Sequence, residues 1–138
     1  MRSINSVFAA IGMVIMLVVV AIGCVSTPPS QDASVAANDT AESMFLAFNT
    51  GDFGQFSGHF SDAMKKSMNE SAFNDMRNQI QSKYGNYTSK TLADSFVDTP
   101  YYDFRYDCKF EKGSLRIRLV MNGTDPSTVE GLWFPHGI

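Results

Sequence analysis

The stretch Tyr101–Asn122, YYDFRYDCKFEKGSLRIRLVMN, decides the fold of this chain, because its side chains alternate between two kinds. Successive side chains of an extended strand point to opposite faces of a sheet. One face therefore collects apolar side chains, and the other collects mainly charged ones. The apolar set is Tyr102, Phe104, Tyr106, Cys108 and Phe110, followed by Leu115, Ile117, Leu119 and Met121. The alternation predicts two antiparallel strands with one buried and one solvated face.

A tight turn at Lys112-Gly113 would join these two strands into a hairpin. The register that follows sets Phe110 opposite Leu115, and Asp107 opposite Arg118. A slip of one residue would move every apolar side chain to the solvated face, so the pattern constrains the pairing. Further strands are expected over 90–98 and 128–134.

The residues before the hairpin have the periodicity of helices. Asp39 and Glu42 have the spacing of a capping box, which predicts a helix over 40–50 that ends at Gly51. Two short helices with one apolar stripe should follow, interrupted near Gly58 and capped again by Ser61, and then a helix over 70–84. Helices followed by about four antiparallel strands define an α+β fold, with the helices packed on one face of the sheet.

The N-terminus has the features of an export signal. A single basic residue, Arg2, precedes an apolar run over 7–23, and Ala21-Ile22-Gly23-Cys24 resembles the lipobox of prokaryotic lipoproteins. Three readings stay open: lipidation of Cys24, a retained anchor helix, and cleavage with simple secretion. All three place the rest of the chain on the extracytoplasmic side, because the basic end stays inside. We expect a domain attached to the cell membrane through its N-terminus.

The predicted organisation is a signal peptide or anchor over 1–23, a flexible tether over 24–38, and an α+β domain over 39–138. The tether is inferred from residues rich in Ser, Ala and Pro. Four Asn residues start N-x-[ST] sequons and are candidate glycosylation sites: Asn38, Asn69, Asn86 and Asn122.

Composition limits the partners and cofactors. The chain has 11 Lys and Arg against 14 Asp and Glu, a net charge of −3, which argues against nucleic-acid binding. His59 and His136 have no second ligand at metal-binding spacing, and no phosphate-binding loop is present, so no metal or cofactor is expected. If Cys24 carries lipid, Cys108 has no disulfide partner, and we expect it to be a small side chain of the core. The alternative is a disulfide between Cys24 and Cys108.

The order of these motifs resembles a known family. Gly51-Asp52-Phe53, Phe60-Ser61, the YYDFRYDCKFEKG strand and a last strand reading Val129-Glu130-Gly131-Leu132 resemble the domain-of-unknown-function family numbered 3887, over about 39–135. That family comprises small exported domains with a cone-shaped fold similar to nuclear transport factor 2. The resemblance implies a curved sheet around helices, which encloses an apolar cavity or forms a homodimer. It implies no activity, because the family has no established catalytic residues.

The inward strand faces favour a binding module over an enzyme, because they contain no carboxylate or histidine. The residues expected to line a cavity are Tyr102, Phe104, Tyr106 and Cys108. We expect non-enzymatic binding of a small apolar ligand or a partner protein, in this cavity or on the charged sheet face. One alternative is an isomerase or hydratase that uses Asp94 with Tyr102 or Tyr106. Another is a structural envelope component that self-associates.

Overall fold

The computed structural model describes residues 26–138. The predicted signal or anchor over 1–23 and the lipidation candidate Cys24 lie outside this range. Among the helices in the described range, none is both long and apolar enough to cross a membrane.

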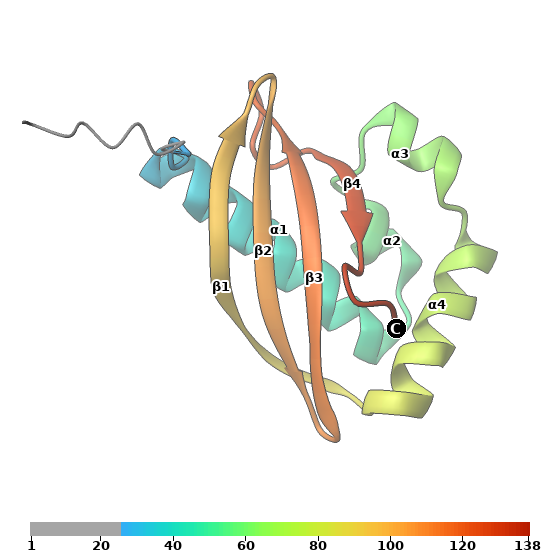
Figure 1. Cartoon of the computed structure of the whole chain (residues 1–138). Helices are drawn as coiled ribbons and strands as arrows, with labels where there is room; N and C mark the ends of the chain where they lie inside the picture. Colours follow the sequence, from blue (N-terminus) through green and yellow to red (C-terminus); the bar gives the residue numbers. More distant parts are fainter. Residues whose placement is uncertain (1–25) are drawn as a thin grey trace, which may run out of the picture.

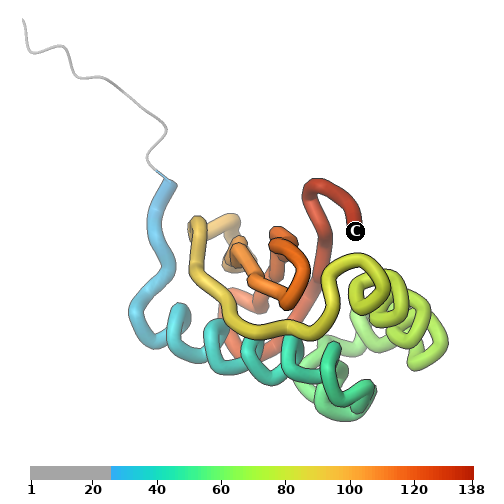
Figure 2. Tube along the Cα trace, turned by 90° about the horizontal axis from the view of Figure 1, so that it is seen from below, coloured from blue at the N-terminus to red at the C-terminus, as the bar shows by residue number. Residues whose placement is uncertain are grey.

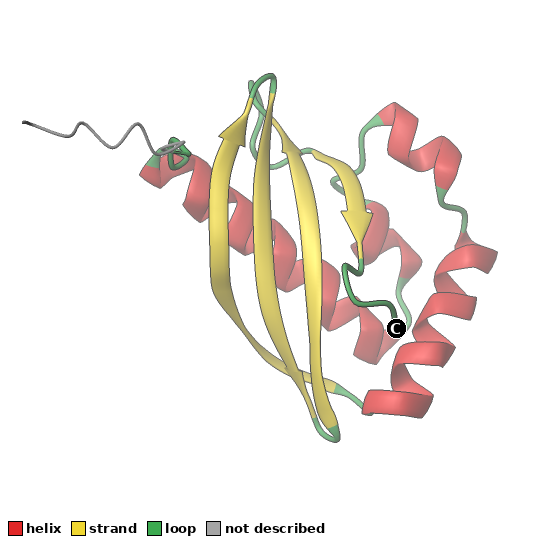
Figure 3. Ribbon diagram, in the orientation of Figure 1, coloured by secondary structure: helices red, strands yellow, loops and turns green. Residues whose placement is uncertain are grey.

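Four helices precede four strands, as the sequence predicts (Figure 1). The strands form one antiparallel sheet in the order β1-β2-β3-β4, and the sheet is curved. The longest helix, α1, crosses one face of the sheet, while α2, α3 and α4 lie beside it, near β4 (Figures 1 and 3). The elements are α1 (Gln31–Thr50), α2 (Phe53–Ser57), α3 (Asp62–Ser67), α4 (Glu70–Tyr84), β1 (Tyr87–Asp98), β2 (Tyr101–Phe110), β3 (Gly113–Asn122) and β4 (Val129–Trp133).

The face of the sheet that α1 covers, here called the inner face, carries the apolar side chains of the alternating pattern. Phe104, Tyr106 and Cys108 are fully buried there. Phe45 of α1 packs edge-on against the Tyr106 ring, with 6.0 Å between the ring centroids. The predicted alternation and the α+β class are confirmed.

The helix boundaries after residue 40 follow the predicted signals. Gly51 ends α1 with φ of 74°, a left-handed conformation that glycine adopts without strain. The Ser61 side chain accepts a hydrogen bond from the backbone of Met64 and caps α3. The predicted break near Gly58 and the helix over 70–84 are both confirmed.

The predicted start of the domain is wrong, because residues 31–38 are helical rather than a flexible tether. Ser30 caps α1, and Asp39 lies within the helix instead of at its N-terminus. Ala33 and Ala37 are buried on the face of α1 that also carries Ala41. Small residues at steps of four let a helix approach a sheet closely, whereas the composition alone suggested a linker.

The hairpin register is also wrong, by two residues. The turn lies at Glu111 and Lys112, so that Phe110 pairs with Gly113 and Asp107 with Arg116. A shift by an even number keeps every side chain on its predicted face, which is why the alternation did not reveal it. The turn is instead held from outside the hairpin, because the Lys112 N–H donates to the Tyr84 carbonyl at the end of α4, at 2.8 Å.

The segment before α1 is docked on the edge of the sheet. The Val97 N–H of β1 donates to the Thr27 carbonyl at 2.8 Å, and Pro29 is buried. The chain therefore joins the fold several residues before the predicted domain boundary.

Candidate functional site

The inner face of the sheet does not form the predicted cavity. Phe104, Tyr106 and Cys108 have exposed fractions of 0%, because side chains of α1 fill the space above them. Tyr102, at the end of β2, is only partly buried. Three of the four predicted lining residues are therefore core residues.

One polar cluster lies at the edge of this core. Glu42 of α1 accepts hydrogen bonds from the Tyr87 hydroxyl at 2.9 Å and from the Lys90 ammonium at 2.6 Å. The Tyr106 hydroxyl is buried with no hydrogen-bond partner within residues 26–138. The cluster joins α1 to β1, and Glu42 acts here instead of in the predicted capping box.

The titration of the buried groups argues against a nucleophile in this cluster. Burial raises the pKa of Cys108 to about 12, so its thiol stays protonated at neutral pH. Burial also raises the pKa of Tyr106, and burial together with the Glu42 carboxylate raises the pKa of Tyr87. These shifts fit packed core groups that stay neutral.

The predicted enzymatic pair does not form. Asp94 points to the opposite face of the sheet from Tyr106, with 59% of its side chain exposed, 3.9 Å from Arg105. Tyr102 likewise belongs to the inner face. The alternative that Asp94 acts with one of these tyrosines is therefore wrong.

The uncovered face of the sheet, here called the outer face, carries a ladder of ion pairs. Asp103 is only 1% exposed and contacts two guanidiniums, Arg118 at 2.6 Å and Arg105 at 3.4 Å. Arg116 donates to both carboxylate oxygens of Asp107, at 2.7 and 2.9 Å. This is the pair that the predicted register assigned to Arg118.

A pocket of about 440 Å³ lies on the outer face, where the C-terminal segment folds back over the sheet. Figure 2 shows this segment on the side of the sheet opposite to α1. We call it the outer pocket; it is lined by Arg105, Arg116, Arg118, Trp133, Phe134, Pro135 and His136.

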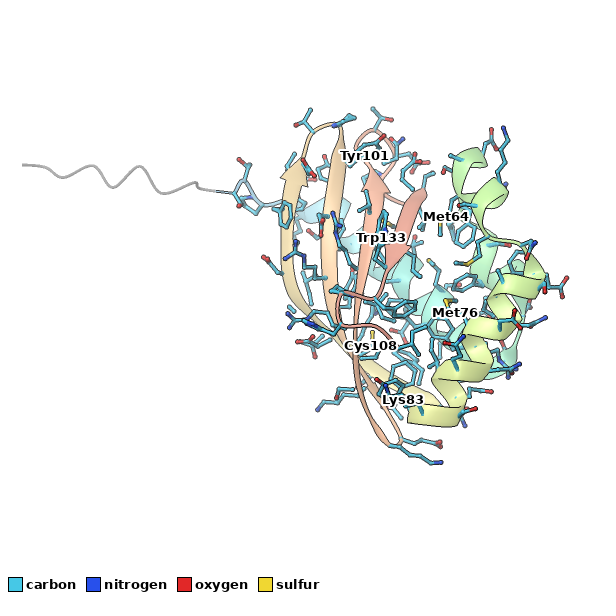
Figure 4. The ribbon with its side chains drawn as sticks, turned by 45° about the vertical axis from the view of Figure 1, so that its right-hand side comes forward. Met64, Met76, Lys83, Tyr101, Cys108 and Trp133 are labelled. Carbon is cyan, nitrogen blue, oxygen red and sulfur yellow. The ribbon has the colours of Figure 1, made fainter. Side chains whose placement is uncertain are left out.

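Trp133, labelled in Figure 4, forms the aromatic wall of the outer pocket. Its ring lies so close to Gly131 that a Cβ there would come within 2.1 Å of it. The guanidinium carbon of Arg118 lies 5.1 Å from the ring centroid, within the range of a cation–π contact. Gly131 and Arg118 together hold the indole against the sheet, so its position is built into the fold.

The candidate lining residues were predicted on the apolar face, and the charged face was named only as a surface, so no residue of the outer pocket was predicted as a ligand contact. The available signal was Gly131-Leu132-Trp133. A glycine two residues before a tryptophan on the same face of a strand leaves room for the indole to lie back across the strand.

The structure places the four sequons differently. Asn38 lies within α1, and Asn86 is exposed in the turn after α4. Asn69 caps α4, where its side-chain oxygen accepts from the Ala72 N–H at 2.8 Å. Asn122 donates to Glu130 and accepts from the Thr124 N–H, so its side chain already has a structural role. Glycosylation stays a prediction.

The described part of the chain holds no group of three His, Cys, Asp or Glu residues able to bind a metal ion.

Fold and site together define a small α+β domain, whose helices cover one face of a four-stranded antiparallel sheet and whose pocket opens on the other. The chain belongs to the family described as "Protein of unknown function (DUF3887)", whose model matches residues 41–132. A comparison with curated proteins finds no match.

Among solved structures, the chain is similar to AclR, a proposed hydroxylase from Streptomyces galilaeus. The identity is 8%, and the match covers 72% of this chain and 77% of that one, with a TM-score of 0.43. A likeness this distant carries no inference about activity.

Proposed function

We propose that this protein is a membrane-tethered, extracytoplasmic module that binds a small ligand in the outer pocket without catalysing a reaction. The observation that carries the proposal is the position of Trp133, held by Gly131 and Arg118 at the wall of a pocket of about 440 Å³. Ligand sites are typically concave, about 300–1,000 Å³, and combine apolar walls with a few polar groups. The outer pocket has this size and this mixture.

The tethered, extracytoplasmic location rests on the apolar run over 7–23 and the lipobox-like residues before Cys24. The absence of catalysis is supported by the inner face, where the groups with raised pKa values are buried beneath α1. Of the two places that the sequence suggested, the inner cavity and the charged face of the sheet, the proposal keeps the charged face, which no helix of residues 26–138 covers.

Native mass spectrometry of the full chain, extracted from membranes in a mild detergent, tests the binding. We expect one co-purified small molecule per chain, lost in Trp133→Ala. Leu92→Ala is the matched control, because Leu92 is also an exposed apolar side chain but lies on β1 and does not line the outer pocket. Retention of the molecule in Trp133→Ala would exclude this pocket, and its chemical conversion would make the protein an enzyme. A doubled mass without ligand would indicate self-association.

The same spectra test the tether. A mass that begins at Cys24 with added acyl chains supports lipidation, whereas a chain that keeps an unmodified Met1 excludes it.

A further inference from the structure

The outer pocket is lined by charges of one sign. Three guanidiniums and one histidine contribute to its wall, and none of its lining residues is acidic. The carboxylates that balance these charges lie beside or beneath the pocket: Asp103 is buried, and Asp94 and Asp107 contact the guanidiniums from outside the lining. A bound molecule would therefore meet the donor groups and not the acids.

Two of the three guanidiniums are already engaged. Arg116 donates two hydrogen bonds to Asp107, and Arg118 donates to Asp103 while it stacks on Trp133. Their role is to shape the wall.

Arg105 differs from both of them. Its nearest carboxylate contacts are at 3.4 Å, to Asp103, and 3.9 Å, to Asp94, and it donates no hydrogen bond within residues 26–138. Its Nε atom is buried without a hydrogen-bond partner in that range. The Phe96 ring lies 5.1 Å from its guanidinium carbon, so the side chain is held in place. Its Nε is buried beside Asp103, and its terminal N–H groups donate no hydrogen bond within residues 26–138. A guanidinium has five such donors, arranged as a fork that matches a carboxylate.

The aromatic part of the pocket complements this free donor group. Trp133 is 49% exposed, and Phe134 and Pro135 extend the apolar wall beyond it. A molecule that used the whole pocket would place an anionic group on Arg105 and a flat apolar body against Trp133.

We propose that the outer pocket binds a small carboxylate-bearing molecule with a flat apolar body, and that Arg105 holds its carboxylate. The inference rests on the proposed function, because it names the chemical class of the ligand for the same pocket. It favours a carboxylate over inorganic phosphate, because three of the seven lining residues are apolar and phosphate would leave them in contact with water.

The chain contains a single tryptophan, Trp133, so its intrinsic fluorescence reports directly on the pocket. We would titrate the full-length protein in a non-ionic detergent with benzoate, with benzamide as its neutral analogue, and with inorganic phosphate. We expect a saturable change with benzoate, at least tenfold weaker binding of benzamide, and no saturable change with phosphate.

Variants of two cations on the outer face of β2 make the test specific. Arg105→Gln should remove the preference for benzoate over benzamide, while Lys109→Gln should keep it, because Lys109 lies on the same face of the same strand but outside the pocket lining. Circular dichroism checks that each variant is folded. If Arg105→Gln does not fold, Arg105→Lys keeps the charge without the fork, and the proposal expects the preference for benzoate to fall without disappearing; an unchanged preference would overturn the role of the fork.

Each outcome separates this inference from the proposed function. Equal affinity for benzoate and benzamide, or equal effects of Arg105→Gln and Lys109→Gln, overturns the role of Arg105 but leaves a binding pocket. Saturation by phosphate alone replaces the carboxylate with an inorganic anion. No response to any probe, while the co-purified molecule is still lost in Trp133→Ala, overturns the carboxylate class only. No response and no co-purified molecule overturns both proposals.

Discussion

The inner and outer faces of the sheet are built from alternate residues of the same strands, but their neighbours give them opposite properties. On the inner face Tyr106 and Cys108 lie under α1, and burial raises their pKa values. On the outer face Arg105, the residue before Tyr106 in β2, and Trp133 of β4 stay partly exposed. Residue type alone would assign chemistry to the thiol and the phenol. The covering helix keeps both of them buried, and the outer face holds the side chains that reach solvent.

The largest loss of stability is expected when an aromatic ring is removed from the inner face. Phe104→Ala removes a fully buried aromatic side chain, which should lower the free energy of unfolding by about 4 kcal/mol. The control is Lys109→Ala, on the outer face of the same strand, which should have no measurable effect. Guanidinium denaturation of both variants checks this, and similar losses would mean that the two faces contribute alike to stability.

The second effect concerns Asp103, which lies on the outer face but is as deeply buried as the inner-face residues. Asp103→Asn removes the charge shared by Arg105 and Arg118, and we expect a loss of about 2 kcal/mol, because hydrogen bonds to charged groups are stronger than neutral ones. Asp107→Asn should cost clearly less, since the Asp107–Arg116 pair is solvated. Denaturation curves in which both variants lose the same stability would show that the burial of Asp103 is unimportant.

The third effect is a loss of stability at alkaline pH. The Cys108 pKa is about 12 in the fold, against 9.0 for a free thiol, so only the unfolded chain loses this proton between those values. The stabilisation is complete below pH 9 and declines as the pH rises towards 12, with about 1 kcal/mol lost at pH 10. Cys108→Ala should lose less over the same range. Unfolding curves at pH 8 and 10 measure the difference, and identical pH dependence in both proteins would contradict the assignment.

The smallest effect on stability is expected from removing single tyrosine hydroxyls in the core. Tyr106→Phe removes a buried hydroxyl with no partner in the described range, so we expect no change or a gain of up to about 1 kcal/mol. Tyr87→Phe removes a hydroxyl that donates to Glu42 and should instead destabilise. Thermal unfolding of the two variants in parallel gives the sign, and a clear loss in Tyr106→Phe would mean that its hydroxyl has a partner.

The sequence predicted the order of the elements and the face of each strand residue, because both follow from local periodicity. It did not predict the hairpin register, because a shift of two residues preserves the pattern and the turn is held by the end of α4, far away in the sequence. It placed the start of α1 too late, because alanines at steps of four resemble a linker in composition.

The outer pocket was harder to predict than the fold. Its wall depends on the C-terminal segment folding back over Arg105, Arg116 and Arg118, which no local pattern encodes. The choice of Asp94 as a catalytic candidate failed for a related reason. The irregular pairing of β1 between Leu92 and Asp94 changes the side to which later residues point, and a strict alternation cannot locate such a bulge.

If Cys24 carries a lipid as proposed, the hydrogen bond between Val97 and Thr27 limits how far the domain can move from the membrane. With Cys24 lipidated as proposed, only three peptide steps separate the lipid from a residue docked on the sheet, about 10 Å of fully extended chain. A tether this short would keep the domain close to the bilayer surface. A ligand would then be captured from the layer of water directly next to the lipid head groups.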